Sequence, residues 1–349
     1  MFNGCTRLVG GQGFSYSENC TSVVYANPGE QGYFTKRVPY ALLSGDNKIL
    51  TFYYGAKPAN GLDVGPFTSA SRRAWHENDV LITKVEFDKS MKNCTSITST
   101  AYWFSGLFNL TDIEGLKYLN TENVSDMKYM FNDCEKLTSI ELNGFKTAKV
   151  TDMSRMFYNC QELTSLDVSG FKTAEVTDMN KMFYLCMKLT SLDVSGFNTA
   201  KVTNMSNMFC SCGVTTIYCD DDWYNPDITS DYMFDGCWNL VGGSGFDFDE
   251  DYVTVEYANP GEEGYFTMKT YMKGDVNGDG KVTPADAIMI LYHYFNVNQN
   301  GFKIQAADLN GDGNITPADA IETLYKYFGN GNHNARATRP TTSDSRNPE

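Results

Sequence analysis

Apolar residues in the middle of the chain recur with a period of 26 residues. The segments LTSIELNGF, LTSLDVSGF and LTSLDVSGF begin at Leu137, Leu163 and Leu189, and their apolar and polar positions alternate as in a short strand. Between them, VSDMKYMFNDC, VTDMSRMFYNC, VTDMNKMFYLC and VTNMSNMFCSC repeat a second apolar pattern in fixed phase. Repeats of about 20–29 residues stack their strands into a parallel sheet over one continuous core. The pattern therefore predicts a solenoid over residues 101–240.

The same repeat accounts for the high content of cysteine and methionine. Of ten cysteines, six occupy one position of the repeat. A zinc site needs Cys or His ligands that converge at local spacing, whereas cysteines on stacked rungs all point the same way. We therefore expect buried, unpaired thiols that pack as small apolar groups, with the methionines as core filler. The six are Cys5, Cys134, Cys160, Cys186, Cys212 and Cys237.

The strand motif and the Met-Phe-Cys motif together resemble the leucine-rich repeats of BspA-type bacterial surface proteins, over roughly residues 36–268. The resemblance implies adhesion to host matrix proteins or to other cells. Outward strand positions would offer hydroxyls and carboxylates to an extracellular protein or glycan ligand; the alternative is a solvated sheet face with no partner. These positions are Thr138, Ser139, Glu141, Thr164, Ser165, Asp167, Thr190, Ser191 and Asp193.

A longer repeat relates residues 1–35 to residues 233–267, at a gapless offset of 232 with 22 of 35 positions identical. Met1 corresponds to Met233, which lies in the middle of a rung. We therefore expect residues 1–35 to be the remnant of a preceding array cap, in a chain that is a C-terminal fragment or starts at an internal methionine. The missing signal peptide is then no evidence for the cytoplasm, and we expect secretion or display on the cell surface.

A solenoid needs protected ends, and the flanking segments suit that role. In residues 36–100 the pattern predicts a β-rich flank, with a hairpin in YALLSGDNKILTFYYG and a strand in VLITKVEFD. Residues 241–272 are expected to form the C-terminal cap and linker. The tail 330–349 has almost no apolar residues and is predicted to be disordered.

Two acidic loops near the C-terminus, DVNGDGKVTPAD and DLNGDGNITPAD, carry the strongest chemical signal. Each has oxygen-bearing side chains at positions 1, 3 and 5, glycine at the sharp turn of position 6, and a carboxylate at position 12. Position 7 offers a backbone carbonyl, and the threonine at position 9 a hydroxyl. This set suits Ca²⁺ better than the tighter octahedron of Mg²⁺. We expect two calcium ions, the alternative being acidic turns without metal. The ligands are Asp275, Asn277, Asp279, Lys281, Thr283 and Asp286, then Asp308, Asn310, Asp312, Asn314, Thr316 and Asp319.

These loops resemble dockerin repeats over about residues 273–329, each loop being followed by one helix, ADAIMILYHYF or ADAIETLYKYF. The resemblance implies calcium binding and a cohesin-like partner. In dockerins of cellulose-degrading assemblies, loop positions 10 and 11 are often a Ser-Thr type of pair that hydrogen-bonds the cohesin. Both copies here have Pro-Ala at these positions, so a cohesin partner would need a different specificity. We expect one apolar stripe on each helix to pack against the other. The stripes are Ile288, Leu291 and Phe295, and Ile321, Leu324 and Phe328.

Composition narrows the function further. A net charge of −15 without a basic stripe argues against nucleic acid, and no stretch approaches the ~20 apolar residues of a membrane span. The three histidines lie in no nucleophile or metalloprotease motif, so we expect no enzyme.

The expected fold is mixed: a leucine-rich-repeat solenoid with a parallel sheet and β-rich flanking caps, followed by a small α-helical, EF-hand-like dockerin domain over residues 273–329. The expected function is recognition or adhesion outside the cell, with a calcium-stabilised docking module. The alternatives are an accessory component of an extracellular polysaccharide-degrading assembly that binds cohesin, and a calcium module that only rigidifies the C-terminus.

Overall fold

The computed structural model describes residues 36–269, 272–278, 280–297 and 302–330. The expected remnant 1–35, the candidate ligand Asp279 and the tail 331–349 lie outside the described residues. The chain divides into two compact units, residues 1–269 and 270–349, which are described separately below.

The first unit begins with the hairpin that the sequence predicts. Strands β1 (Arg37–Leu43) and β2 (Ile49–Ala56) pair antiparallel, with Leu43 opposite Leu50. Strands β3 (Lys84–Phe87) and β4 (Asp112–Glu114) then add in parallel, giving the order β1-β2-β3-β4. Short 3-10 helices span Ala70–Arg72, His76–Asn78, Lys89–Asn93, Leu116–Tyr118 and Val255–Tyr257.

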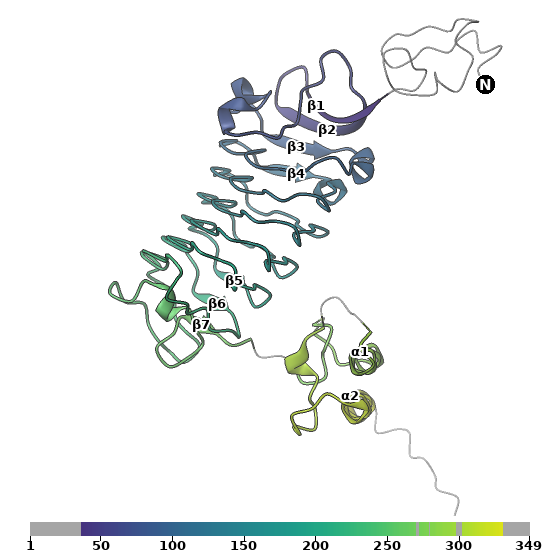
Figure 1. The fold of residues 1–349 in the computed structure, drawn as a ribbon, viewed down its shortest axis with the longest axis vertical. Helices are drawn as coiled ribbons and strands as arrows, with labels where there is room; N and C mark the ends of the chain where they lie inside the picture. Colours follow the sequence, from purple (N-terminus) through teal and green to yellow (C-terminus); the bar gives the residue numbers. More distant parts are fainter. Residues whose placement is uncertain (1–35, 270–271, 279, 298–301, 331–349) are drawn as a thin grey trace, which may run out of the picture. The chain divides into compact units, whose positions relative to one another are not determined.

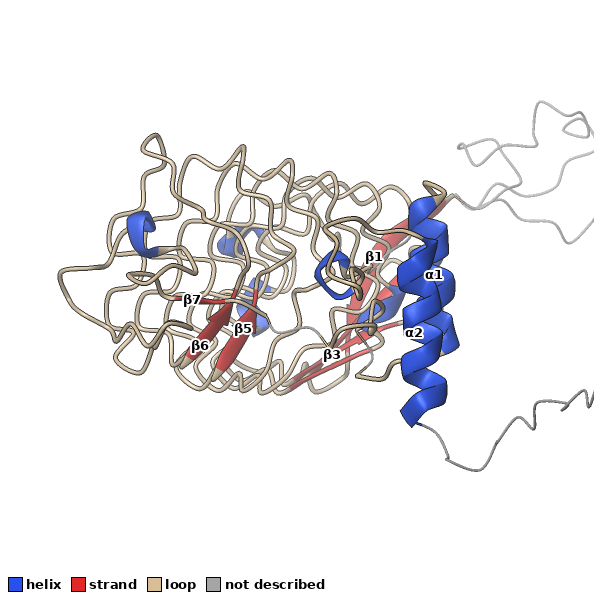
Figure 2. Cartoon of the chain, turned by 90° about the horizontal axis from the view of Figure 1, so that it is seen from below, coloured by secondary structure: helices blue, strands red, loops and turns tan. Residues whose placement is uncertain are grey.

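A second parallel sheet lies at the other end of the solenoid and contains β5 (Ser191–Asp193), β6 (Thr216–Tyr218) and β7 (Phe266–Thr267). Figure 1 shows the rungs stacked between the two sheets, and in Figure 2 β3, β5 and β6 lie along one edge of this unit. The continuous parallel sheet that we predicted is therefore present only in part, because residues 137–142 and 163–168 form no regular strand.

The rungs are joined mainly on the side of the VTDM motif. Parallel bridges connect Ser99, Asp126, Asp152, Asp178, Asn204 and Thr229 in succession. Beyond the bridges, the backbone N–H groups of one rung donate to the carbonyls of the next: Tyr129 N lies 2.9 Å from Ser154 O, and Phe131 N lies 2.9 Å from Met156 O. Other N–H groups donate to the preceding rung, as from Thr151 N to Ser125 O at 2.9 Å, so each rung satisfies its backbone through both neighbours.

The first rung has no preceding rung, and the N-terminal flank supplies hydrogen-bond donors instead. The carbonyl of Trp103 accepts hydrogen bonds from Arg73 Nη1 at 3.1 Å and from Trp75 Nε1 at 3.2 Å. Arg73 is buried and is neutralised by Asp79, whose Oδ2 lies 2.6 Å from Nη2. Residues 70–79 therefore close the end of the backbone hydrogen-bond pattern.

Stacked rings fill the solenoid interior. Phe131, Phe157, Phe183 and Phe209 are fully buried, and successive rings lie 5.5–5.8 Å apart and nearly parallel. The buried methionines of the repeat surround them. They are Met127, Met130, Met153, Met156, Met179, Met182, Met205 and Met208.

The cysteines behave as predicted in the described residues, where all eight are free and buried. The structure adds a reason for their place in the repeat: each repeat thiol donates to a backbone carbonyl of the preceding rung, for example Cys160 Sγ to Phe131 O at 3.2 Å. Burial raises the pKa of the Cys212 thiol to about 12, so it stays a neutral donor near pH 7.

The second unit contains two helices, α1 (Pro284–Tyr294) and α2 (Pro317–Asn330), with a 3-10 turn at Ile304–Ala306. The two helices run side by side (Figure 2) over a small core that includes Val276, Ala287 and Ile290.

The apolar stripes that we predicted to pack the two helices together are wrong, because the buried face of each helix is rotated by part of a turn from the predicted one. Ile288 and Ile321 are 49% and 51% exposed, and Phe295 and Phe328 are 66% and 65% exposed. The helices instead approach through small side chains such as Ala287 and Ala320, together with Leu291 and Leu324.

Candidate functional site

The first acidic loop folds around its own aspartates. Asp275 accepts hydrogen bonds from the backbone N–H groups of Gly278 and Gly280, at 2.9 and 2.8 Å. Asp286 is fully buried and accepts from Asn277 N at 3.1 Å and from Thr283 N at 2.8 Å, so it also caps the first turn of α1. The first and twelfth positions are thereby held by one short loop.

The second loop repeats this arrangement. Asp308 accepts hydrogen bonds from the N–H groups of Gly311 and Gly313, at 2.8 and 3.1 Å. Asp319, fully buried, accepts from Leu309 N and from Thr316 N, both at 2.9 Å. Burial opposes the charge of the Asp319 carboxylate, but the hydrogen bonds from Thr316, Asn310 and Leu309 outweigh burial and lower its pKa.

Both turns have the backbone that a calcium loop requires at its sixth position. Gly280 and Gly313 have φ angles of 82° and 83°, a region that side-chain-bearing residues rarely adopt. Asp312, at the fifth position, is exposed and accepts a hydrogen bond from Asn314 N at 2.8 Å. Within the described residues, which omit Asp279, no three His, Cys, Asp or Glu side chains form a metal-binding cluster. The oxygen donors and the two buried carboxylates nevertheless fit a hard cation.

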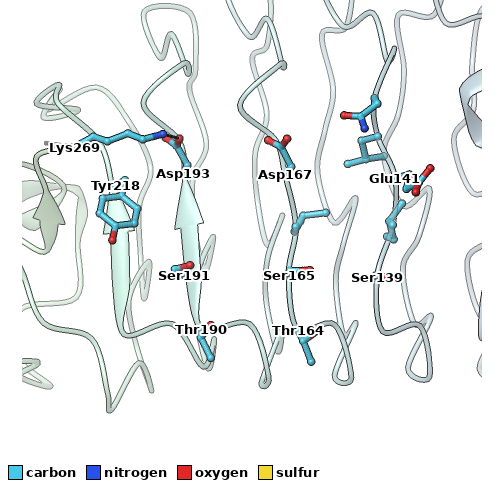
Figure 3. Close-up of a pocket in the computed structure, with 14 residues that line it drawn as sticks. Ser139, Glu141, Thr164, Ser165, Asp167, Thr190, Ser191, Asp193, Tyr218 and Lys269 are labelled. Atoms are coloured by element: carbon cyan, nitrogen blue, oxygen red, sulfur yellow. Dashed lines mark hydrogen bonds and ion pairs between the residues drawn. The ribbon is translucent and has the colours of Figure 1, made fainter. Parts of the chain in front are cut away.

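A groove of about 640 Å³ crosses the strand side of the solenoid (Figure 3). Its rim repeats one pair of side chains on three rungs, and its floor includes the largely buried Ile140 and Leu166. The outward orientation predicted for these positions is correct. The repeated pairs are Ser139 with Glu141, Ser165 with Asp167, and Ser191 with Asp193.

The groove carboxylates are held in place by local hydrogen bonds. Asp167 Oδ1 accepts from the backbone N of Ser169 at 3.0 Å and from its hydroxyl at 2.6 Å. Asp193 accepts from Ser195 N at 3.1 Å and from Lys269 Nζ at 2.5 Å. Burial opposes the charge of Asp193, but these bonds outweigh it and lower its pKa. Asp193 is therefore charged at neutral pH, and both carboxylates are oriented by their hydrogen bonds.

Two groove residues were missed by the sequence reasoning. Tyr218 comes from β6, and Lys269 reaches the groove from the end of the first unit, as Figure 3 shows. Tyr218 lies beside Asp193 in register, on a rung whose spacing is 25 residues, and Lys269 follows the last rung. The only available signal was that Lys269 is the first basic residue after Lys201.

The comparisons with known proteins assign the two parts separately. Residues 273–328 match the dockerin type I domain family. Residues 82–166 and 138–240 match a family described as a mycoplasma protein of unknown function, DUF285. A search of curated proteins gives no match.

Two solved structures of bacterial leucine-rich-repeat proteins also match. The T. pallidum protein is 17% identical with a TM-score of 0.29, covering 51% of this chain and 77% of its own. The Eubacterium ventriosum protein is 15% identical with a TM-score of 0.18, covering 59% of this chain and 84% of its own.

The repeat geometry and the family match together define a class: an array of 26-residue rungs joined to a small calcium-loop module. The chain therefore combines a repeat array that matches the DUF285 family with a C-terminal segment that matches the dockerin type I domain. Dockerin type I domains bind calcium. Among the described residues, no helix is both long and apolar enough to cross a membrane.

Proposed function

We propose that the protein is a non-catalytic recognition or adhesion protein that acts outside the cell, as a secreted or surface-displayed molecule. In this proposal the solenoid groove binds a protein or glycan ligand and the C-terminal module docks onto a second partner. The observation that carries the proposal is the groove itself, where carboxylates and hydroxyls recur on three consecutive rungs and hydrogen bonds orient two of the carboxylates. Repeat proteins use such continuous faces for binding.

The groove is tested by placing a bulky cation in it. Ser165 is exposed in the middle of the groove, so Ser165→Arg should block ligand binding and neutralise the row of carboxylates. Binding of the full chain to immobilised fibronectin, to cells and to a glycan array should fall at least tenfold. The matched control is Ala174→Arg, which adds the same side chain at an exposed position outside the groove. If both variants bind as the unmodified chain does, the groove is not the ligand site.

We further propose that the C-terminal module holds two calcium ions, one in each loop. Aspartates at positions 1, 5 and 12, with the asparagine at position 3, would supply side-chain oxygens, and Lys281 and Asn314 backbone carbonyls. The threonines at position 9 would add a hydroxyl or hold a water. Because the core of this unit is small, calcium binding would contribute to its folding free energy.

The alternative role is an accessory component of an extracellular polysaccharide-degrading assembly, docked onto a cohesin. Its support is the pair of exposed apolar stripes in equivalent positions of the two helices, each with its large side chains at i, i+4 and i+7. Exposed apolar patches of this kind mark interaction surfaces. The stripes are Ile288 and Tyr292 on α1 with Phe295 directly after it, and Ile321, Tyr325 and Phe328 at the equivalent positions of α2.

A pull-down with purified cohesin domains tests this role. The full chain should be captured in calcium and released by EDTA, and Phe295→Ala combined with Phe328→Ala should reduce capture at least tenfold. Phe108→Ala is the control, because it removes an exposed phenylalanine from the solenoid. If no cohesin captures the full chain in calcium, the alternative role is excluded for the cohesins tested, while the groove proposal is unaffected.

A further inference from the structure

Six aromatic side chains gather where residues 238–265 close the last rung of the solenoid. Trp238 lies 5.3 Å from Phe248 between ring centroids, Phe246 lies 5.1 Å from Tyr265, and the rings of Phe248 and Tyr265 lie 6.2 Å apart. Tyr252 joins through Phe246 at 5.8 Å, and Tyr257 lies 4.8 Å from Tyr252. We call this set the aromatic cap: Trp238, Phe246, Phe248, Tyr252, Tyr257 and Tyr265.

One side of the aromatic cap packs against the last rung of the solenoid, and the other side is exposed to solvent. Tyr265 is fully buried against Phe234 of the last rung, and its hydroxyl accepts a hydrogen bond from Asp249 N at 3.0 Å. Trp238 is 66% exposed and Tyr252 is 38% exposed, so part of each ring faces solvent. A fixed cluster of aromatic rings with exposed faces is typical of an interaction surface, where Trp and Tyr dominate binding.

Charge is distributed unevenly along the first unit. Residues 36–201 contain 19 basic and 19 acidic residues, whereas residues 202–268 contain 13 acidic residues and no Lys or Arg. Some of these carboxylates lie beside the cap. Together with burial, Glu256, Glu263 and Asp249 raise the pKa of Tyr257. The exposed ring faces are therefore bordered by negative charge, and this stretch of sequence supplies no cation to cover them.

Elsewhere the solenoid covers its outer tyrosines with its own cations. Arg155 stands over Tyr129 and Tyr158, at 5.1 and 5.8 Å from the ring centroids, and Lys181 stands over Tyr184 at 5.4 Å. A cation above an aromatic face is attracted by the ring quadrupole, and a nearby carboxylate adds to that attraction. The aromatic cap also has exposed aromatic rings beside carboxylates. Residues 202–268, however, contain no Lys or Arg that could cover these rings.

We propose that the aromatic cap is a docking surface for a cationic segment of a partner protein, one that presents Arg or Lys side chains to the rings and carboxylates. Trp238 and Tyr252 would receive the aliphatic stem and charged head of such side chains. Asp249, Glu250 and Asp251 would supply ion pairs and speed the encounter. The cap shares no residue with the groove or with the calcium loops, so it stands independently of the proposed function.

The test uses the full chain and a fluorescein-labelled twelve-residue peptide of alternating Arg and Gly, with a Glu-Gly peptide as its counterpart. Fluorescence anisotropy should show salt-sensitive binding of the Arg peptide and none of the Glu peptide. Trp238→Ala and Tyr252→Ala should each weaken binding by about threefold, the scale of one exposed cation–π contact. The matched control Tyr224→Ala removes an exposed tyrosine outside the cap and should change nothing.

The outcomes separate the cap from simple charge attraction. Circular dichroism first checks that each variant is folded. If the Trp238→Ala, Tyr252→Ala double variant binds the Arg peptide as tightly as the unmodified chain, or if the Arg peptide does not bind at all, the proposal is overturned. A dimer of the chain in light scattering that Trp238→Ala dissociates would assign the cap to a second copy instead, which also contradicts it.

Discussion

Replacing Phe157 by alanine is expected to lower the free energy of unfolding of the solenoid by about 3–5 kcal/mol. Phe157 is fully buried, and its ring lies 5.5 Å from Phe131 and 5.8 Å from Phe183. Because each rung of a solenoid contacts only its neighbours, the cavity would weaken both interfaces of the central rung at once. Urea unfolding followed by circular dichroism measures the loss.

Tyr158 provides the matched control, since it is the next residue but is half-buried on the outer side, where it stacks on Tyr184 at 4.9 Å. Tyr158→Ala should cost about 0.5–1.5 kcal/mol, the range of a single aromatic pair. Equal losses in the two variants would mean that the inward and outward assignments of the repeat are wrong.

Replacing Asp319 by alanine is expected to unfold the C-terminal module in calcium while leaving the solenoid transition unchanged. The Asp319 carboxylate is fully buried, binds the N–H groups of Leu309 and Thr316, and occupies the twelfth position of the proposed second calcium loop. Its removal would leave those N–H groups without their acceptor and take one ligand from the ion. Differential scanning calorimetry should show two transitions in the unmodified chain, of which the variant and EDTA each abolish the same one.

Glu322→Ala tests whether any lost carboxylate has this effect. Glu322 is exposed on α2, three residues after Asp319. Its removal should leave both transitions in place. A module transition that is insensitive to EDTA in the unmodified chain would contradict the link between calcium and folding.

The repeat period predicted the stacked rungs because inward positions must be apolar on every rung. It did not predict how the rungs are joined. The LTSLDV segment at 163–168 has the alternation of a strand, yet it forms one inter-rung backbone hydrogen bond, from Thr164 N to Thr138 O, while the bridges run through Asp126, Asp152 and Asp178. Side-chain alternation specifies which face is buried, not which backbone groups pair.

The helix stripes failed for a related reason. Large apolar residues at i, i+3 and i+7 predict a buried face, but in this small module Ala287 and Ala320 let the helices approach closely and Ile288 and Ile321 are left at the surface. Lys269 in the groove and the rings of the aromatic cap could not be predicted either. They come from the irregular closing segment, where position in space depends on tertiary packing and not on a period.

The central claim, that a solenoid is joined to a calcium-dependent module, is tested most directly by counting calcium ions. Isothermal titration of the EDTA-stripped full chain should show two Ca²⁺ ions bound per chain. Asp275→Ala and Asp308→Ala should each remove one of them, because each takes the first ligand of one loop. No calcium binding by the unmodified chain, or binding of two ions that survives both substitutions, would contradict the account.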